Sequence, residues 1–170
     1  MHPVEVKAAL ESMVILVDTR EQDTPRLRAR LRQMGVPYER CKLDFGDYSV
    51  KCDALSLADT VCIERKMAIS ELCHCYCQER PRFEREFERA KKAGARIYLL
   101  TEDATWEDIY AGKYRSQMKP ESLVASILAW VARYNCHLLF CKSSTTGKLI
   151  KDTLQRELKE RLEAMPDADA

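Results

Sequence analysis

The sequence predicts an α/β fold in which helices flank a mixed central β-sheet. Short apolar runs suited to buried strands recur along the chain, and segments with the apolar spacing of helices stand between them. This alternation favours parallel strands in part of the sheet. With 170 residues, 46% of them hydrophobic, the chain can bury one good core. We therefore expect a single domain over residues 1–170, with its core at about 13–162.

The first half of the chain predicts a strand, a helix and a three-stranded meander. Pro25 suits the start of a helix and Gly35 its end, while Gly46 separates two segments in which apolar and polar residues alternate. We interpret those two segments as the arms of a hairpin. The expected elements are a strand at 13–18, a helix at 23–35, hairpin strands at 36–44 and 47–52, and a strand at 60–66.

The second half predicts helices that alternate with two more buried strands. In the last helix Ile150, Leu154, Leu158 and Leu162 recur every four residues and form an apolar stripe that a partner could cover. The final residues, 166–170, are expected to fray. The expected elements are helices at about 67–79, 81–94, 106–112, 119–135 and 148–165, with strands at 95–101 and 136–141.

The overall charge excludes a molecule that binds polyanions over its whole surface. Lys and Arg number 28, and Asp and Glu 27, for a formal net charge of +1, so a nucleic-acid site must be a local patch. The apolar runs fall far short of the roughly 20 residues that span a bilayer, and we expect no membrane partner. The N-terminal residues lack the apolar region of a secretion signal, so reduced thiols are expected for the eight cysteines. We expect an intracellular protein, in a bacterial or phage-infected cytoplasm, or in the nucleus if the source is eukaryotic.

Acidic and basic residues gather where predicted strands end. Side chains alternate along a strand, so Glu64 and Lys66 point to one face about 7 Å apart while Arg65 points to the other. Asp18 and Asp47 lie at similar places. Carboxylates bind Mg²⁺ together with substrate phosphate, and a nearby ammonium can orient water or offset phosphate charge. Each charge alone could be a solvated strand end or a turn, but the combination is less common and favours metal-assisted phosphodiester hydrolysis.

Three motifs carry a family resemblance: VDTRE at 17–21, GDYSV at 46–50 and IERKMAIS at 63–70. In this order and spacing they resemble the nuclease motif of the XPF and Mus-type structure-specific endonucleases, a branch of the PD-(D/E)XK superfamily. The resemblance extends over roughly residues 13–145 and is greatest to the stand-alone nuclease domains of bacteria and their phages. It implies a restriction-endonuclease-like sandwich with a mixed central β-sheet flanked by helices.

The resemblance implies a divalent-metal-dependent DNA endonuclease that acts on flaps, forks or junctions during replication, repair or recombination. Carried over to this sequence, it implies that Mg²⁺ or Mn²⁺ is bound by Asp18, Asp47 and Glu64. Lys66 would position the nucleophilic water. Supporting roles would fall to Arg20, Glu21 and Arg65.

One position departs from the family pattern. The family has Asp four residues after the lysine, whereas this chain has Ser70, followed by Glu71. On a helix Glu71 is turned about 100° from Ser70, so it is not an automatic substitute. The alternative function is therefore a catalytically weak or inactive nuclease-fold subunit that binds DNA or pairs with an active partner. The same family implies a homodimer or a nuclease-fold partner. Related eukaryotic and archaeal enzymes carry a helix-hairpin-helix module, for which we expect no room here.

Two basic segments could contact the DNA backbone, with an affinity that depends on salt and little on sequence. Glutamates in the first segment could instead absorb part of its charge in intrahelical pairs. In the second segment Tyr114 could stack on a base. The candidates are Arg80, Arg82, Arg85 and Arg89 in the first segment and Lys113, Arg115 and Lys119 in the second. A further basic run contains Arg26, Arg28, Arg30 and Arg32.

A cysteine cluster offers a third and weaker interpretation. Cys73, His74, Cys75 and Cys77 suggest a thiol- or zinc-based regulatory module. Their spacing lacks the C-x₂-C pair of ordinary structural zinc sites, and a helix would turn Cys73 and Cys75 about 200° apart. We therefore rank this interpretation below the other two.

Overall fold

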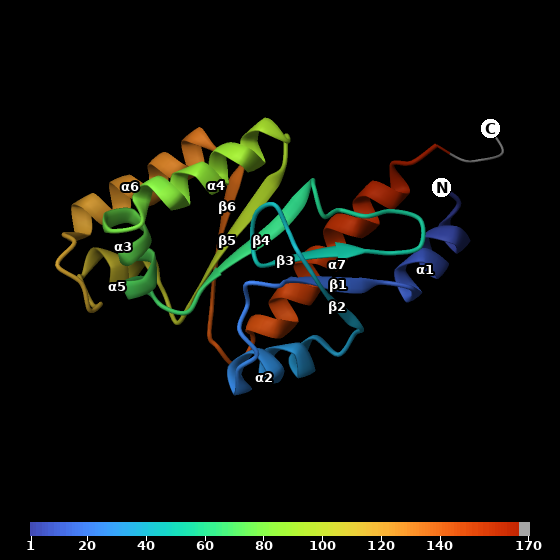
Figure 1. The fold of residues 1–170 in the computed structure, drawn as a ribbon, viewed down its shortest axis with the longest axis horizontal. Helices are drawn as coiled ribbons and strands as arrows, with labels where there is room; N and C mark the ends of the chain where they lie inside the picture. The colour runs from blue at the N-terminus through green and yellow to red at the C-terminus, as the bar shows by residue number, and fades with distance from the viewer. Residues whose placement is uncertain (167–170) are drawn as a thin grey trace.

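The computed structural model describes residues 1–166 and shows one six-stranded β-sheet with helices on both faces (Figure 1). The strands are β1 (Val14–Asp18), β2 (Tyr38–Cys41), β3 (Tyr48–Lys51), β4 (Val61–Lys66), β5 (Arg96–Glu102) and β6 (Cys136–Cys141). Their order in the sheet is β2-β1-β3-β4-β5-β6, and all of them except β3 run in the same direction. The carboxyl ends of these five strands therefore lie along one edge of the sheet.

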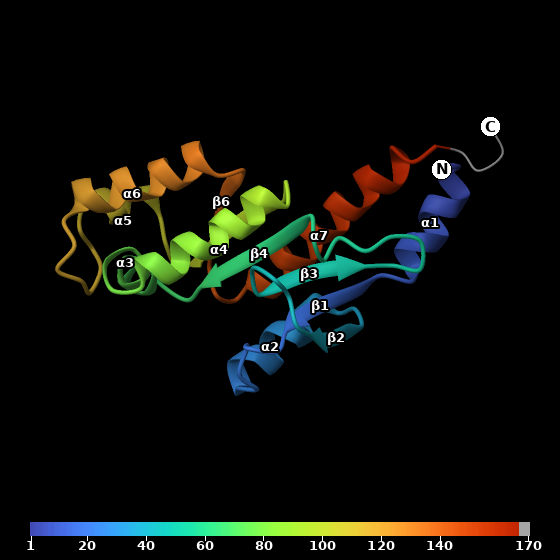
Figure 2. The same ribbon diagram turned by 45° about the horizontal axis from the view of Figure 1, so that its top comes forward.

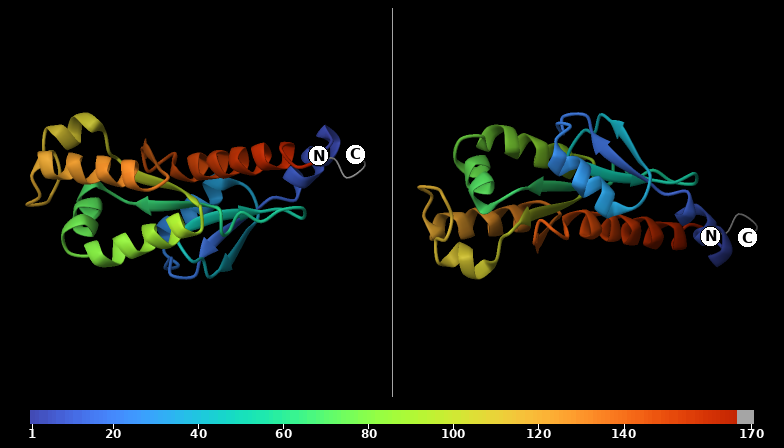
Figure 3. Two further views of the ribbon diagram at one scale, coloured as in Figure 1. Left: turned by 90° about the horizontal axis from the view of Figure 1, so that it is seen from above. Right: turned by 90° about the horizontal axis from the view of Figure 1, so that it is seen from below.

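The helices pack into two apolar cores on opposite faces of the sheet. They are α1 (Pro3–Glu11), α2 (Pro25–Met34), α3 (Ile69–Cys77), α4 (Arg80–Lys92), α5 (Trp106–Tyr110), α6 (Pro120–Arg133) and α7 (Thr146–Glu163). One core joins α3, α4, α5 and α6 to the sheet around Trp130, and the other joins α1, α2 and α7 to it around Ile15 and Leu154. Figure 3 shows the first group at one end of the elongated molecule and α1 at the other. The predicted fold class, a mixed sheet flanked by helices, is confirmed.

The predicted hairpin at 36–52 is wrong, because β1 lies between its two arms (Figure 2). β1 pairs in parallel with β2 and antiparallel with β3. Its residues Ile15, Leu16 and Val17 are buried, so pairing on both sides satisfies backbone groups that water cannot reach. β2 is exposed over most of its length and forms the edge of the sheet. Alternation in the sequence could not show which neighbour each arm would take.

Two further features differ from the sequence analysis at the ends of the chain. No element was expected before residue 13, yet α1 forms there, with a capping box between His2 and Glu5 and with Val6 buried in the second core. The apolar stripe of α7 is buried in that same core and is not a surface for a partner. Met1 donates a hydrogen bond to the carbonyl oxygen of Met165, so both ends of the described chain lie together.

The remaining expectations concern the tail and the membrane. The frayed end predicted for 166–170 lies, apart from its first residue, outside the described residues. Within residues 1–166, no helix has both the length and the apolar run that crossing a membrane requires.

Candidate active site

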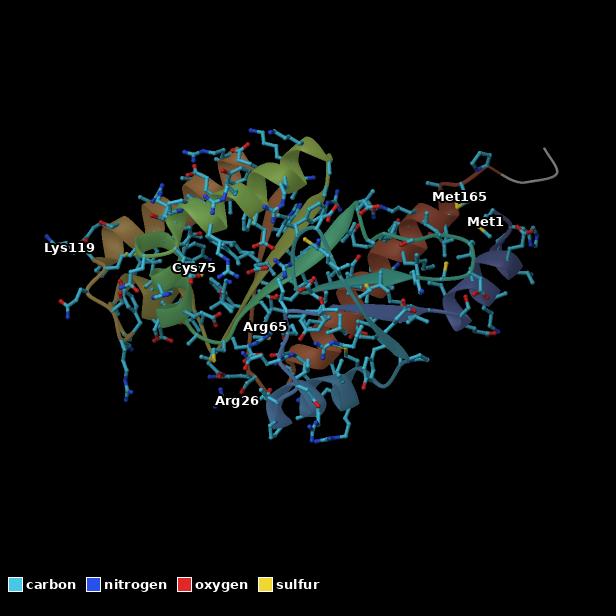
Figure 4. All side chains as sticks on the ribbon, in the orientation of Figure 1. Met1, Arg26, Arg65, Cys75, Lys119 and Met165 are labelled. Atoms are coloured by element: carbon cyan, nitrogen blue, oxygen red, sulfur yellow. The ribbon has the colours of Figure 1, made fainter. Side chains whose placement is uncertain are left out.

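Charged side chains gather in a pocket of about 360 Å³ at the carboxyl end of β4. Figure 4 labels Arg65 on the β4 side of this pocket and Cys75 on the α3 side. Six of the seven predicted catalytic residues line it, and the exception is Asp18. The carboxylates of the pocket are Glu21, Asp47, Glu64, Glu71, Glu79 and Glu86. Its cations are Arg20, Arg65, Lys66 and Arg82.

Asp47 is held at the pocket by the turn before β3. Gly46 has a left-handed backbone (φ 73°), and a Cβ atom there would lie 2.7 Å from Cβ of Cys62, so glycine lets the turn approach β4. Oδ2 of Asp47 accepts a hydrogen bond from the backbone N–H of Arg65 at 2.8 Å. Burial raises the pKa of Asp47, and the negative charge of Glu64 raises it further. A cation bound beside Asp47 would relieve this repulsion.

Glu64 and Lys66 point to the same face of β4, as strand alternation predicts. Both residues are buried, and Nζ of Lys66 donates to Oε1 of Glu64 at 2.5 Å. Nζ also lies 5.1 Å from the ring centroid of Phe83. Burial lowers the pKa of Lys66, but the charge of Glu64 outweighs burial and holds that pKa above its ordinary value. Lys66 therefore brings a positive charge to the floor of the pocket.

Asp18 lies behind the pocket, with both carboxylate oxygens engaged. Oδ1 accepts hydrogen bonds from the backbone N–H of Arg20 at 2.8 Å and from its Nε at 2.6 Å. Oδ2 accepts one from the backbone N–H of Leu43 at 2.7 Å. Burial raises the pKa of Asp18, but the hydrogen bonds from Arg20 and Leu43 outweigh burial and leave that pKa below its ordinary value. Asp18 thus positions Arg20, and its place among the metal ligands stays a prediction.

Glu21 and Arg65 connect the pocket to the opposite face of the sheet. Oε2 of Glu21 accepts from the hydroxyl of Tyr48 at 2.9 Å, and Nε of Arg30 donates to the same hydroxyl at 2.9 Å. Glu102, which ends β5, lies 3.6 Å from Arg30 and 3.5 Å from Arg65. Arg30 is therefore buried in an ion-pair network, which corrects the basic run predicted along α2. Sequence reasoning missed Glu102, although it ends a buried strand, the signal that marked the other acids.

The start of α3 decides which of Ser70 and Glu71 faces the pocket. Ala68 is extended, and α3 begins at Ile69. Ser70 consequently lines a separate cavity, whereas Glu71 lines the active-site pocket. Oε2 of Glu71 accepts from the backbone N–H of Met67 at 2.7 Å, which holds its carboxylate near the end of β4. The two residues therefore face different cavities, as their separation of about 100° on a helix predicts, and Glu71 supplies an acid to this wall.

Glu86 is a pocket carboxylate that sequence reasoning missed. It reaches the pocket from α4, where Oε1 accepts from the backbone N–H of Gly46 at 2.7 Å. Burial raises the pKa of Glu86, and the charge of Glu64 adds to the rise. The signal was present in the sequence, because Glu86 follows Phe83 by three residues and so lies on the apolar stripe of α4, where a charge is unusual.

The ERCC4 domain family matches residues 17–153 of this chain. This range includes every residue that lines the pocket. The chain belongs to the ERCC4 domain family. Among solved structures, this ERCC4 domain is similar to XPF from Aeropyrum pernix, with a TM-score of 0.60 and 20% identity over 90% of this chain and 62% of that one. It is also similar to XPF from Aeropyrum pernix in complex with DNA, with a TM-score of 0.61 and 21% identity over 92% and 68% of the two chains. At such identities the likeness shows the fold. No curated protein matches the sequence.

The basic residues predicted along α4 of the ERCC4 domain have different surroundings. Arg82 lines the active-site pocket, and Arg85 is exposed. The guanidinium of Arg80 lies 5.1 Å from the ring centroid of Trp130. Nη2 of Arg89 donates to the carbonyl oxygen of Asp44 at 3.0 Å. Of these residues, Arg82 is therefore placed best for contact with a ligand of the pocket.

The predicted loop cations lie between α5 and α6. Lys113 pairs with Asp108 at 3.6 Å, and Lys119 is exposed at the start of α6 (Figure 4). Arg115 lines the cavity that also contains Ser70.

The cysteines of the predicted cluster face different cavities because they lie on different sides of α3. Cys73 and Cys77 line the cavity with Ser70, while Cys75 lines the active-site pocket. Burial raises the pKa of Cys75 to about 11, so its thiol is protonated at neutral pH. This division does not favour one zinc site that uses all four predicted residues.

The donor set of the ERCC4 pocket fits a hard divalent cation. Carboxylate oxygens are the ligands that Mg²⁺ and Mn²⁺ prefer, and Asp47 and Glu64 present them in one pocket. Within residues 1–166, no three His, Cys, Asp or Glu side chains are already arranged to hold an ion. The 2.5 Å contact between Glu64 and Lys66 shows one reason, because the ammonium occupies the oxygen that a metal would use.

Proposed function

We propose that this ERCC4 domain is a divalent-metal-dependent DNA endonuclease. The observation that carries the proposal is the position of Asp47, Glu64 and Lys66 in one pocket at the carboxyl edge of the sheet. Two carboxylates and an ammonium are the groups that metal-assisted hydrolysis of a phosphodiester requires. Membership of the ERCC4 family supports the same reaction.

Each side chain has a role that follows from its surroundings. Asp47 and Glu64 would hold Mg²⁺ or Mn²⁺, and Asp18, which lies behind the pocket, would join them as a third ligand. The ion supplies Lewis-acid activation of water and phosphate when bound. Lys66 would orient the attacking water and offset charge on the phosphate. Arg65, tied to the far face of the sheet by Glu102, would support the phosphate from the side.

We extend the proposal to the substrate, which we take to be DNA. The similar XPF structure from Aeropyrum pernix is a complex with DNA, which supports DNA as the ligand here. We propose branched DNA, such as a flap, fork or junction, cut during replication, repair or recombination. Exposed cations would hold its backbone, namely Arg82 at the pocket and Arg85, Arg115 and Lys119 outside it. A second copy or a nuclease-fold partner would contribute to recognition of the branch.

Cleavage of labelled DNA tests the function directly. Purified protein is incubated with flap, fork, junction, duplex and single-stranded DNA in Mg²⁺, Mn²⁺ or EDTA. We expect metal-dependent cutting that Asp47→Ala abolishes. Asp44→Ala is the matched control, because Asp44 is an exposed acid three residues away that lines no part of the pocket. Equal cutting by native protein and Asp47→Ala would refute the proposal.

The alternative, an inactive subunit, is tested by two neighbouring substitutions. If the pocket is intact, Glu71→Gln slows cutting because Glu71 lines the active-site pocket, whereas Ser70→Asp does not speed it because Ser70 lines another cavity. Faster cutting by Ser70→Asp would instead show that the serine weakens the native site. DNA binding without cutting by the native protein would favour the inactive subunit.

A further inference from the structure

A second cavity adjoins the active site on the other side of α3. It has a volume of about 370 Å³ and lies between α3 and the loop at 112–119. α3 contributes Ser70, His74 and Gln78 to its wall, and the loop contributes Arg115 and Gln117. The cavity is large enough for a nucleotide, and the catalytic proposal does not use it.

The two cavities are opposite in charge. The active-site pocket contains six carboxylates, as described above, and suits cations. The side chains that line the second cavity within the described residues include no carboxylate. Arg115 brings a positive charge to it, and the amides and hydroxyl of Gln78, Gln117 and Ser70 can donate hydrogen bonds. This set of donors suits a phosphate and the polar groups of a nucleotide.

The two cavities also adjoin each other. His74 lines both of them, and it is exposed on the outer face of α3, where it lies 3.8 Å from Glu79. A strand whose phosphate lies at Asp47 and Glu64 can therefore extend past His74 toward Arg115. Adjacent nucleotides of one strand can then occupy adjacent cavities.

The loop wall of the second cavity has a defined shape. The hydroxyl of Tyr114 donates to the carbonyl oxygen of Met118 at 2.9 Å, and the backbone N–H of Met118 donates to Oγ of Ser116 at 3.1 Å. Tyr114 and Met118 also pack against the core around Trp130. The cavity is thus largely formed before a ligand arrives, which reduces the entropic cost of binding.

We propose that this cavity binds the nucleotide next to the scissile phosphate, on the strand that is cut. Arg115 contacts its phosphate, and Gln78 and Gln117 contact its polar groups. This inference rests on the proposed function, because it locates the flanking nucleotide relative to the same active site. The occupant is the sugar–phosphate backbone of DNA, so the contact carries little sequence preference.

Disulfide crosslinking tests the position of the strand. Cys77 lines the cavity and is exposed, whereas Cys73 is buried. The probes are a set of oligonucleotides, each with a tether at one chosen nucleotide. The tether ends in a mixed disulfide with thiopyridine. The Cys77 thiolate attacks the tether sulfur, a new disulfide forms, and thiopyridone leaves. With Asp47→Ala protein, which is expected not to cut, we expect crosslinks only for tethers within about two nucleotides of the native cut position, and none with Cys77→Ser.

Binding measurements supply an independent test. Loss of a phosphate contact in the double variant Arg115→Ala/Gln117→Ala should weaken DNA affinity about tenfold and reduce the slope of log K against log salt by about one unit. Arg156→Ala is the charge-matched control, because Arg156 is exposed on α7 and pairs with Glu160 at 3.3 Å. Equal losses in the two proteins would overturn the inference.

The outcomes separate this inference from the proposed function. Absence of metal-dependent cutting by the native protein would overturn the function. Metal-dependent cutting together with crosslinks that are absent, evenly spread or independent of Cys77 would overturn only the assignment of the cavity.

Discussion

At the scale of single residues, neighbours decide what each carboxylate of this ERCC4 domain can do. Asp18 and Asp47 look equivalent in the sequence, as acids beside two strands. In the structure Asp18 accepts three hydrogen bonds and has a lowered pKa, whereas Asp47 and Glu86 are half-buried near Glu64 and have raised pKa values. Asp18 therefore stabilises the fold through its hydrogen bonds, whereas Asp47 and Glu86 can bind a cation or a proton.

Glu86→Gln should stabilise the metal-free protein at neutral pH. Folding raises the pKa of Glu86 above its ordinary value of 4.5, so its contribution to stability is complete below pH 4.5 and declines as pH rises through the raised pKa. Gln keeps the acceptor for the backbone N–H of Gly46 and removes the charge. We expect a more stable protein at pH 7 and a flatter dependence of stability on pH above 4.5.

Urea unfolding in EDTA at several pH values measures this effect. Glu84→Gln is the control, because Glu84 lies on the outer side of α4, where it pairs with Arg133 at 3.1 Å. An unchanged pH slope in Glu86→Gln would contradict the prediction.

At the scale of elements, the site depends on how a turn and a helix are attached to the sheet. The turn at Gly46 carries Asp47 to β4, and its backbone also contacts Arg20 and Glu86. α2 is attached through the buried guanidinium of Arg30, which contacts Glu21 and Glu102. Both attachments lie at the carboxyl edge, so a change in either should alter the pocket as well as stability.

Gly46→Ala should destabilise the protein more than the same change at another left-handed glycine. A Cβ at Gly46 would lie 2.7 Å from Cβ and Sγ of Cys62, whereas at Gly35 (φ 66°) it would meet nothing within 4 Å. Ala costs about 1 kcal/mol from backbone strain at Gly35, and the collision raises the cost at Gly46 to about 3 kcal/mol. Urea unfolding of both variants tests this, and equal losses would show that the turn can move away from β4.

Arg30→Ala should cost about 3 kcal/mol, because it leaves the buried carboxylate of Glu102 with fewer partners. Arg28→Ala on the same helix should leave stability almost unchanged, because its pair with Asp23 is exposed. Chemical denaturation compares the two. Similar losses of stability in the two variants would mean that helix propensity, and not the buried ion-pair network, determines how much each arginine contributes.

At the scale of the whole molecule, the sheet separates two cores and presents its carboxyl edge between them. α3 and α4 line the pocket from one core, and α2, in the other core, is linked to it by the ion pair of Arg30 with Glu21 at 3.3 Å. Ligand binding at this edge therefore involves residues held by both layers. A bound ligand should raise the free energy of unfolding of the whole domain.

Mn²⁺ should raise the stability of the native protein. At a free concentration one hundred times its dissociation constant, a ligand that binds only the folded state adds about 2.7 kcal/mol. Thermal unfolding with Mn²⁺ and with EDTA measures the gain, which Asp47→Ala should lose and Asp44→Ala should keep. A gain of equal size in Asp47→Ala would place the ion elsewhere.

The sequence alone determined the fold class, the residues from residue 13 onward that form helices and buried strands, and six of the residues that line the pocket. These follow from local periodicity and from a motif whose members end strands. Only the tertiary structure decided that β1 separates β2 from β3, that Glu71 rather than Ser70 faces the pocket, and that Glu86 joins it from α4. The physical reason is that strand neighbours, helix rotation and burial of a charge are set by contacts between residues far apart in the chain, which local patterns do not encode.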